Sequence, residues 1–229
     1  SLSSSLFGFH QANPNDPSDY TWHSNDVANL QVYAVKPSIF STSAKFVVTN
    51  YDASIYFETD FYEDVYDAQR WNFQLSVKPN GYPNAGAYSQ DEEPEYTARL
   101  YGITHQFGDV KHRFEISSPV NFTTGSAILS NAKRVYLGCH ATNFTVSSHI
   151  ETDVVFDSLR VWMDELNNES IKIHNLDASN YGHDKVYNNT TIFNYGISSS
   201  IEIPGYDSLI LHWNFDQNSS ADSSGEFIV

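Results

Sequence analysis

The sequence has 229 residues, enough for one large β-sandwich or two small domains, so its length does not require a division. Aromatic residues make up 15% of the chain, whereas Cys and Met occur once each, a composition that favours β-strands. The 28 acidic and 12 basic residues give a formal charge of −16, which repels phosphate backbones, so we expect no nucleic-acid partner. No stretch approaches the roughly 20 apolar residues that cross a bilayer, so we expect no membrane insertion.

Short strands dominate the predicted secondary structure. In chain order they are expected at residues 5–12, 29–36, 44–49, 54–61, 71–78, 96–105, 112–117, 134–138, 154–163, 198–203 and 209–215. The clearest is 71–78, where every odd residue is apolar and every even one polar. The last is nearly as clear, with Leu209, Leu211, Trp213 and Phe215 on one face. So many short strands indicate an all-β protein, folded as a sandwich or a barrel.

One short helix is predicted after residue 167. Asn167 is suited to the N-cap position, and Glu169 lies near the positive end of the helix dipole. Leu166, Ile173 and Leu176 are expected to share the buried face. The expected fold is therefore all-β with one short helix.

Four segments carry motifs in a particular order. Residues 66–72 contain a Trp-bearing strand, and 96–101 a Leu-Tyr strand. Residues 132–138 end in Leu-Gly, and 155–171 combine Asp-x-x-Arg-x-Trp with Leu-x-x-Glu-x-Ile. This order resembles laminin-G-like modules of the concanavalin A-like superfamily, over about half of the chain. The resemblance implies one antiparallel β-sandwich with a jelly-roll arrangement.

Two further runs, residues 137–145 and 211–216, are similar to modules in large structural proteins of marine tailed phages. That similarity implies a structural or adhesion role without catalysis, at a virion surface or otherwise outside a cell. No signal-peptide pattern is visible at the start of the sequence, which agrees with release by lysis. The implied partners are other protein subunits, further copies of this chain, or a host-surface glycan.

The end of the chain leaves the domain boundary open between two alternatives. Such modules usually begin with the pattern found here from Trp213 to Gly225. We expect residues 1–207 to form the laminin-G-like sandwich. Residues 208–229 then form either the closing strand of that sandwich or the start of a following module.

A catalytic alternative rests on residues 58–63, which match the Glu-x-Asp-x-x-Glu strand of one family of jelly-roll glucanases. Glu58 and Glu63 would supply the two carboxyl groups, about 5–5.5 Å apart, that a retaining glycoside hydrolase needs. Ile55, Phe57 and Phe61 are expected on the core face, which leaves Tyr56, Glu58 and Asp60 on the other face. With 28 acidic residues, however, such a match arises readily by chance. The hydrolase therefore ranks behind a structural module and behind a carbohydrate-binding lectin.

Long loops rich in Asn, Asp and aromatic residues carry the binding candidates. Aromatic rings with neighbouring amides suit sugar binding, and subunit packing is the alternative. The predicted sugar-binding residues are Tyr20, Trp22, Tyr82, Asn84 and Tyr88. Calcium is the one cofactor considered, because laminin-G-like modules often hold it at the sandwich rim; the alternative is a solvated acidic loop. The calcium candidates are Asp16, Asp19 and Asp26.

Overall fold

The computed structural model describes residues 2–12, 28–81, 95–141, 149–151, 154–176, 208–213, 220–221 and 227–228. The chain divides into two compact units, Ser1–Val154 and Val155–Val229. Each unit is described by itself. The predicted strand at residues 198–203 lies outside the described residues.

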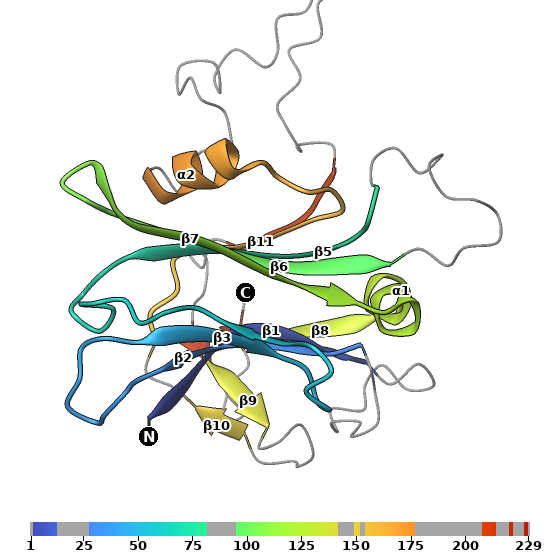
Figure 1. Cartoon of the computed structure of the whole chain (residues 1–229), viewed down its shortest axis with the longest axis horizontal. Helices are drawn as coiled ribbons and strands as arrows, with labels where there is room; N and C mark the ends of the chain where they lie inside the picture. The colour runs from blue at the N-terminus through green and yellow to red at the C-terminus, as the bar shows by residue number, and fades with distance from the viewer. Residues whose placement is uncertain are drawn as a thin grey trace, which may run out of the picture. The chain divides into compact units, whose positions relative to one another are not determined.

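Two antiparallel sheets face each other in the first unit (Figure 1). The larger sheet has the order β4-β3-β2-β1-β8, with bounds β1 (Ser3–Gln11), β2 (Leu30–Val35), β3 (Lys45–Thr49), β4 (Tyr56–Glu58) and β8 (Lys133–Leu137). The smaller sheet is β5 (Trp71–Pro79), β6 (Tyr96–Gln106) and β7 (Asp109–Val120). A separate two-stranded ribbon pairs β9 (Cys139–Ala141) with β10 (His149–Glu151).

Most strand neighbours in the two large sheets are consecutive in the chain, and one pair is not. Within each large sheet, strands that are consecutive in the chain pair with one another. The exception is β8, which returns to pair with β1, with Val135 opposite Phe9. This arrangement confirms the predicted antiparallel sandwich; the jelly-roll order stays a prediction.

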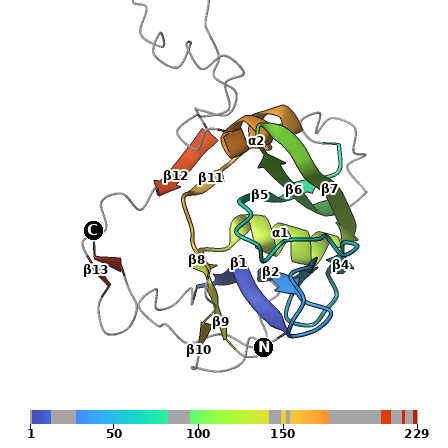
Figure 2. The same ribbon diagram turned by 90° about the vertical axis from the view of Figure 1, so that its left-hand side faces the viewer.

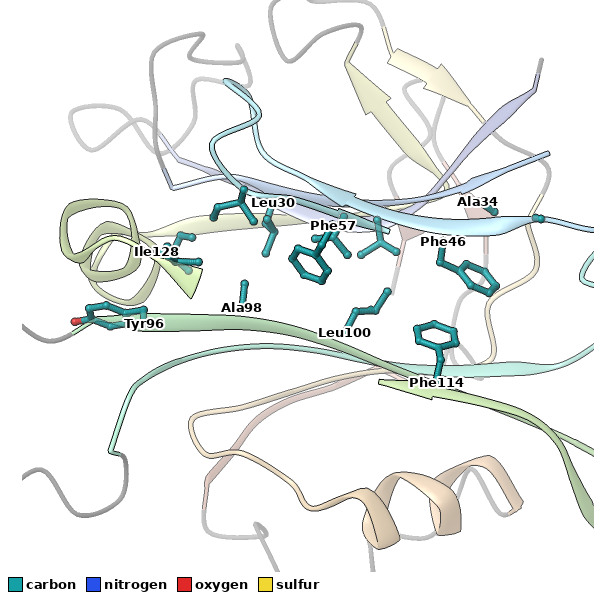
Figure 3. Packing of buried hydrophobic residues seen from close by; sticks show 14 residues of the cluster. Leu30, Ala34, Phe46, Phe57, Tyr96, Ala98, Leu100, Phe114 and Ile128 are labelled. Carbon is teal, nitrogen blue, oxygen red and sulfur yellow. The ribbon is translucent and has the colours of Figure 1, made fainter. Parts of the chain in front are cut away.

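The core of the first unit lies between its two sheets (Figure 3). The ring of Phe46 on β3 lies 4.9 Å from that of Phe73 on β5 and 5.3 Å from that of Phe114 on β7. The odd residues of β5 pack partly buried against this cluster, as the alternation predicts. The fully enclosed members include Leu30, Val32, Ala34, Val48, Ile55, Ala98 and Leu100. Burial of this apolar surface is the main stabilising contribution to the unit.

The prediction of a single helix is wrong, because the first unit also contains α1 (Phe122–Ser130). Asn121 caps it, with Oδ1 accepting a hydrogen bond from the Thr124 N–H at 2.9 Å. Thr and Gly are poor helix formers, so local propensity did not indicate this helix. It is held by packing: Ile128 is buried and points between the two sheets (Figure 3).

The second unit contains β11 (Leu159–Trp162), α2 (Asn168–Leu176) and β12 (Leu209–Trp213), with the short strands β13 (Ser220–Ala221) and β14 (Phe227–Ile228). β12 pairs antiparallel with β11, so the described part of the final predicted strand pairs inside this unit. The boundary expected between residues 207 and 208 stays a prediction.

α2 is the helix that the sequence predicts. Asn167 Oδ1 accepts from the Ser170 N–H at 2.8 Å, which confirms the N-cap. The predicted buried face is wrong in part, because Leu176 is exposed whereas Ile171 and His174 are buried. His174 stacks on Trp162 of β11, with the ring centres 5.5 Å apart. Contact with a neighbouring strand therefore selects a different face from the one that apolar spacing suggested.

Among the described residues, neither α1 nor α2 has the length and hydropathy needed to cross a bilayer.

Candidate functional site

All of the predicted sugar-binding and calcium-binding residues lie outside the described part of the chain. This applies to the sugar-binding candidates Tyr20, Trp22, Tyr82, Asn84 and Tyr88 and to the calcium candidates Asp16, Asp19 and Asp26. They stay predictions. Within the described segments, no three His, Cys, Asp or Glu side chains are grouped as they would be to hold a metal ion.

A β-bulge next to β4 determines which of the following side chains point to the surface. Glu58 lies opposite Val47 on β3, but Tyr62 lies opposite Ala44. The three residues 59–61 therefore lie opposite only two residues, 45 and 46, which is a β-bulge. The Thr59 hydroxyl accepts from the Phe46 N–H at 2.9 Å, while the Thr59 N–H donates to the Phe46 carbonyl at 2.9 Å. These two bonds hold the extra residue in place.

The bulge reverses the alternation of side chains beyond it. Phe61 was expected on the core face, but its side chain is 50% exposed, so that prediction is wrong. Tyr62 packs inward instead, with its ring 5.5 Å from Phe114 and 5.8 Å from Trp71. Burial raises the pKa of Tyr62 above its ordinary value, and the charge of Asp60 adds to this. One inserted residue therefore places Tyr62 in the core and Phe61 at the surface.

Glu58 lies on the outer side of β4 and is held from two sides. Its Oε2 accepts from Lys45 Nζ at 2.7 Å and from the Tyr56 hydroxyl at 2.5 Å. The hydrogen bond from Lys45, followed by that from Tyr56, lowers the pKa of Glu58 below its ordinary value. The carboxylate therefore stays ionised to a lower pH than an ordinary glutamate does.

This environment bears on the catalytic alternative. A retaining glycosidase needs an ionised nucleophile and, close to it, a carboxylic acid with a raised pKa. The lowered pKa of Glu58 does not suit the acid, and Glu63 is an exposed residue in the turn after Tyr62. The hydrolase alternative stays a prediction.

Four side chains form what we call the β4 patch: Lys45, Tyr56, Glu58 and Phe61. Tyr56 is 53% exposed, and Lys45 Nζ lies 5.8 Å from the centre of the Phe61 ring. Alternation along β4 placed Tyr56 and Glu58 on one face in advance. Lys45 joins them through the register of β3, and Phe61 through the bulge, so neither was identified from the sequence.

A second surface feature consists of three exposed side chains that we call the apolar tips: Ile39, Phe40 and Phe107. Ile39 and Phe40 lie in the β2–β3 connection and are 60% and 90% exposed, and Phe107 lies in the β6–β7 turn and is 98% exposed. Both connections lie at the end of the first unit away from α1 (Figure 1), and Figure 2 looks onto that end.

The loops that carry the apolar tips are fixed by contacts with the β4–β5 connection. The Tyr66 N–H donates to the Thr42 carbonyl at 2.9 Å, on the β2–β3 side. On the β6–β7 side, Lys111 Nζ forms an ion pair with Asp64 Oδ2 at 3.0 Å. The β2–β3 connection and strand β7 are therefore each joined to the β4–β5 connection.

Phe107 occupies a position that favours other residues. Its φ is 54° and that of Gly108 is 90°, so the turn has both central residues in the left-handed region. Such two-residue hairpins favour Asn-Gly or Gly-Gly, and a bulky side chain there is strained. The exposed phenyl ring contributes nothing to the core, so the turn itself gives no reason for a phenylalanine.

Comparisons of this chain with protein-family models, with curated proteins and with solved structures give no match. The resemblance to laminin-G-like and phage modules therefore stays a prediction from the motifs. The two features that bear on function are the β4 patch and the apolar tips.

Proposed function

We propose that this chain is a non-enzymatic structural or adhesion module that binds another protein subunit through its apolar tips. The observation that carries this proposal is the near-complete exposure of Phe40 and Phe107 at one end of the sandwich. Aromatic side chains are enriched in the buried centres of protein interfaces and often carry much of the binding energy. The loop that carries Phe40 is hydrogen-bonded to the β4–β5 connection, so it loses less conformational entropy when a partner binds.

The finer part of the proposal is a laminin-G-like module with a concanavalin A-like jelly roll, located at a virion surface. Its support is the order of motifs over residues 66–171, the two facing antiparallel sheets and the acidic charge of −16. A charge of this size keeps a protein soluble and disfavours phosphate-bearing surfaces. The jelly-roll order and the virion location are both inferred by analogy with modules of similar sequence.

A second copy of the chain is the first subunit to test. We would measure sedimentation velocity of the wild-type chain from micromolar to submillimolar concentration, at low and at high salt. Because each copy carries −16, salt should screen the repulsion and strengthen the association. The paired variant Phe40→Ser and Phe107→Ser should be monomeric under the same conditions.

Val155→Ser provides the matched control, because Val155 is 98% exposed and belongs to the second unit. It should associate like the wild type. Equal association of the wild type and the paired variant would contradict the role of the apolar tips. A wild-type chain that stays monomeric at submillimolar concentration would exclude a second copy as the subunit.

A further inference from the structure

We propose that the β4 patch is a binding site for a neutral saccharide, with Tyr56 and Phe61 as stacking surfaces and Lys45 and Glu58 as hydrogen-bonding groups. This site is separate from the sugar-binding residues that the sequence predicts, and separate from the apolar tips. It adds a ligand to the module and does not depend on the proposed subunit contact.

The polar centre of the patch has unused hydrogen-bonding capacity on both sides. Both hydrogen bonds to Glu58 end on Oε2, and among the described residues Oε1 has no hydrogen-bond partner. The ammonium group of Lys45 has three donors, of which one is directed to Glu58. A sugar hydroxyl both donates and accepts, so two neighbouring hydroxyls can pair with this carboxylate and this ammonium group.

Aromatic rings lie at both ends of this polar centre. The Tyr56 hydroxyl is hydrogen-bonded to Glu58, and the Lys45 ammonium group lies over one face of the Phe61 ring, which leaves the other face for stacking. Each of the two aromatic residues is about half exposed, at 53% and 50%. A pyranose has an apolar C–H face and polar edges, which matches an aromatic surface next to a donor and an acceptor.

The patch is built in advance of ligand binding. Lys45 and Glu58 come from adjacent strands, β3 and β4, and the bonds between Thr59 and Phe46 hold the bulge that turns Phe61 outward. Glu58 is fixed by two hydrogen bonds, from Lys45 and from Tyr56, which also lower its pKa. A preorganised site loses little conformational freedom on binding.

Charge and size favour a neutral saccharide over other ligands. The charges of Lys45 and Glu58 cancel, so the patch favours neither cationic nor anionic ligands. The net charge of −16 on the chain further disfavours acidic ligands. β4 has three residues, and short edge strands resist the addition of a further strand from a peptide. Four side chains are also too few for a stable protein interface, which buries about 1,200–2,000 Å² in total.

The test uses the whole chain and two kinds of probe. A glycan array carrying neutral and sialylated glycans would identify the best neutral glycan, and calorimetry would then measure its Kd, expected to be about millimolar for so small a site. Phe61→Ala and Glu58→Ala should each weaken binding about tenfold. Leu129→Ala is the matched control, because it truncates an apolar side chain that is 49% exposed, as Phe61 is 50%, but lies on α1, outside the patch and outside the apolar tips, and it should leave Kd unchanged.

Three results would overturn the assignment. The first is no binding of any neutral glycan at millimolar concentration, and the second is binding that both patch variants retain at full affinity. The third is binding of sialylated glycans alone, since it would contradict the neutral class. Circular dichroism of each variant establishes that the fold is intact, and an equal loss of binding in Leu129→Ala would show that the effect is not specific to the patch.

Discussion

Replacing two neighbouring aromatic residues by alanine tests the bulge next to β4 directly. The ring of Tyr62 lies 6.3 Å from Phe46 and 5.5 Å from Phe114, within the core of the first unit. Phe61, one position earlier, is half exposed and lies beside Lys45. Tyr62→Ala should therefore destabilise the protein far more than Phe61→Ala.

The magnitudes follow from burial. Truncation of a fully buried aromatic residue to alanine costs about 3–5 kcal/mol, and Tyr62 is partly buried, so we expect about 2–3 kcal/mol. Phe61→Ala should cost about 0.5 kcal/mol or less, as at most surface positions. For a chain of this length, a loss of about 1 kcal/mol lowers Tm by about 2–4 °C, so the two variants should differ by about 3–12 °C.

Urea denaturation followed by far-ultraviolet circular dichroism measures both variants, and Tyr62→Phe serves as a control that keeps the ring. The control should retain nearly the wild-type midpoint. If Phe61→Ala were the more destabilising change, strict alternation through residues 55–61 would be right. The bulge, and with it the outward position of Phe61 in the β4 patch, would then be wrong.

Three further predictions concern local features. Gly125→Ala would stabilise α1 by about 1 kcal/mol from helix propensity alone, but the new Cβ would lie 2.3 Å from Cγ of Tyr96. We therefore expect urea denaturation to show a net loss of stability of about 1–3 kcal/mol. A net gain would mean that the Tyr96 ring moves aside freely. Asn121→Ala should cost about 1 kcal/mol by removing the cap of α1, and an unchanged midpoint would show that packing alone holds this helix. Glu58→Gln tests the effect of the lowered pKa of Glu58. A lowered folded-state pKa gives stability that is present above the ordinary value of 4.5 and is lost as pH falls through the folded value. The urea midpoints of the wild type and this variant should therefore differ at neutral pH and converge in acid, and a constant difference would contradict the pairing with Lys45.

Local patterns were enough to predict much of the secondary structure. Alternation identified β5 and the strand that contains β12, because side chains on a strand alternate between its faces whatever the partner strand is. The strands predicted at 29–36 and 96–105 are present as β2 and β6. Asn167 was identified as a cap because its hydrogen bond reaches only three residues along the chain. Such features depend on neighbours in sequence.

α1 was missed because its stability comes from contacts with residues distant in sequence. Phe122–Ser130 has weak helix formers, and it is the packing of Gly125 against Tyr96 and the burial of Ile128 that make the helix favourable. The buried face of α2 was mistaken for a related reason. His174 is inside because Trp162 of β11 offers it a stacking partner, which apolar spacing does not register.

The candidate site shows the same division. The sequence by itself determined that Tyr56 and Glu58 share the outer face of a short strand, since residues i and i+2 of a regular strand point to the same side. Tertiary structure alone decided that Lys45 pairs with Glu58, because that contact depends on the register between β3 and β4. It also decided that Phe61 points outward and Tyr62 inward, because a single inserted residue, held by Thr59 and Phe46, reverses every side chain beyond it.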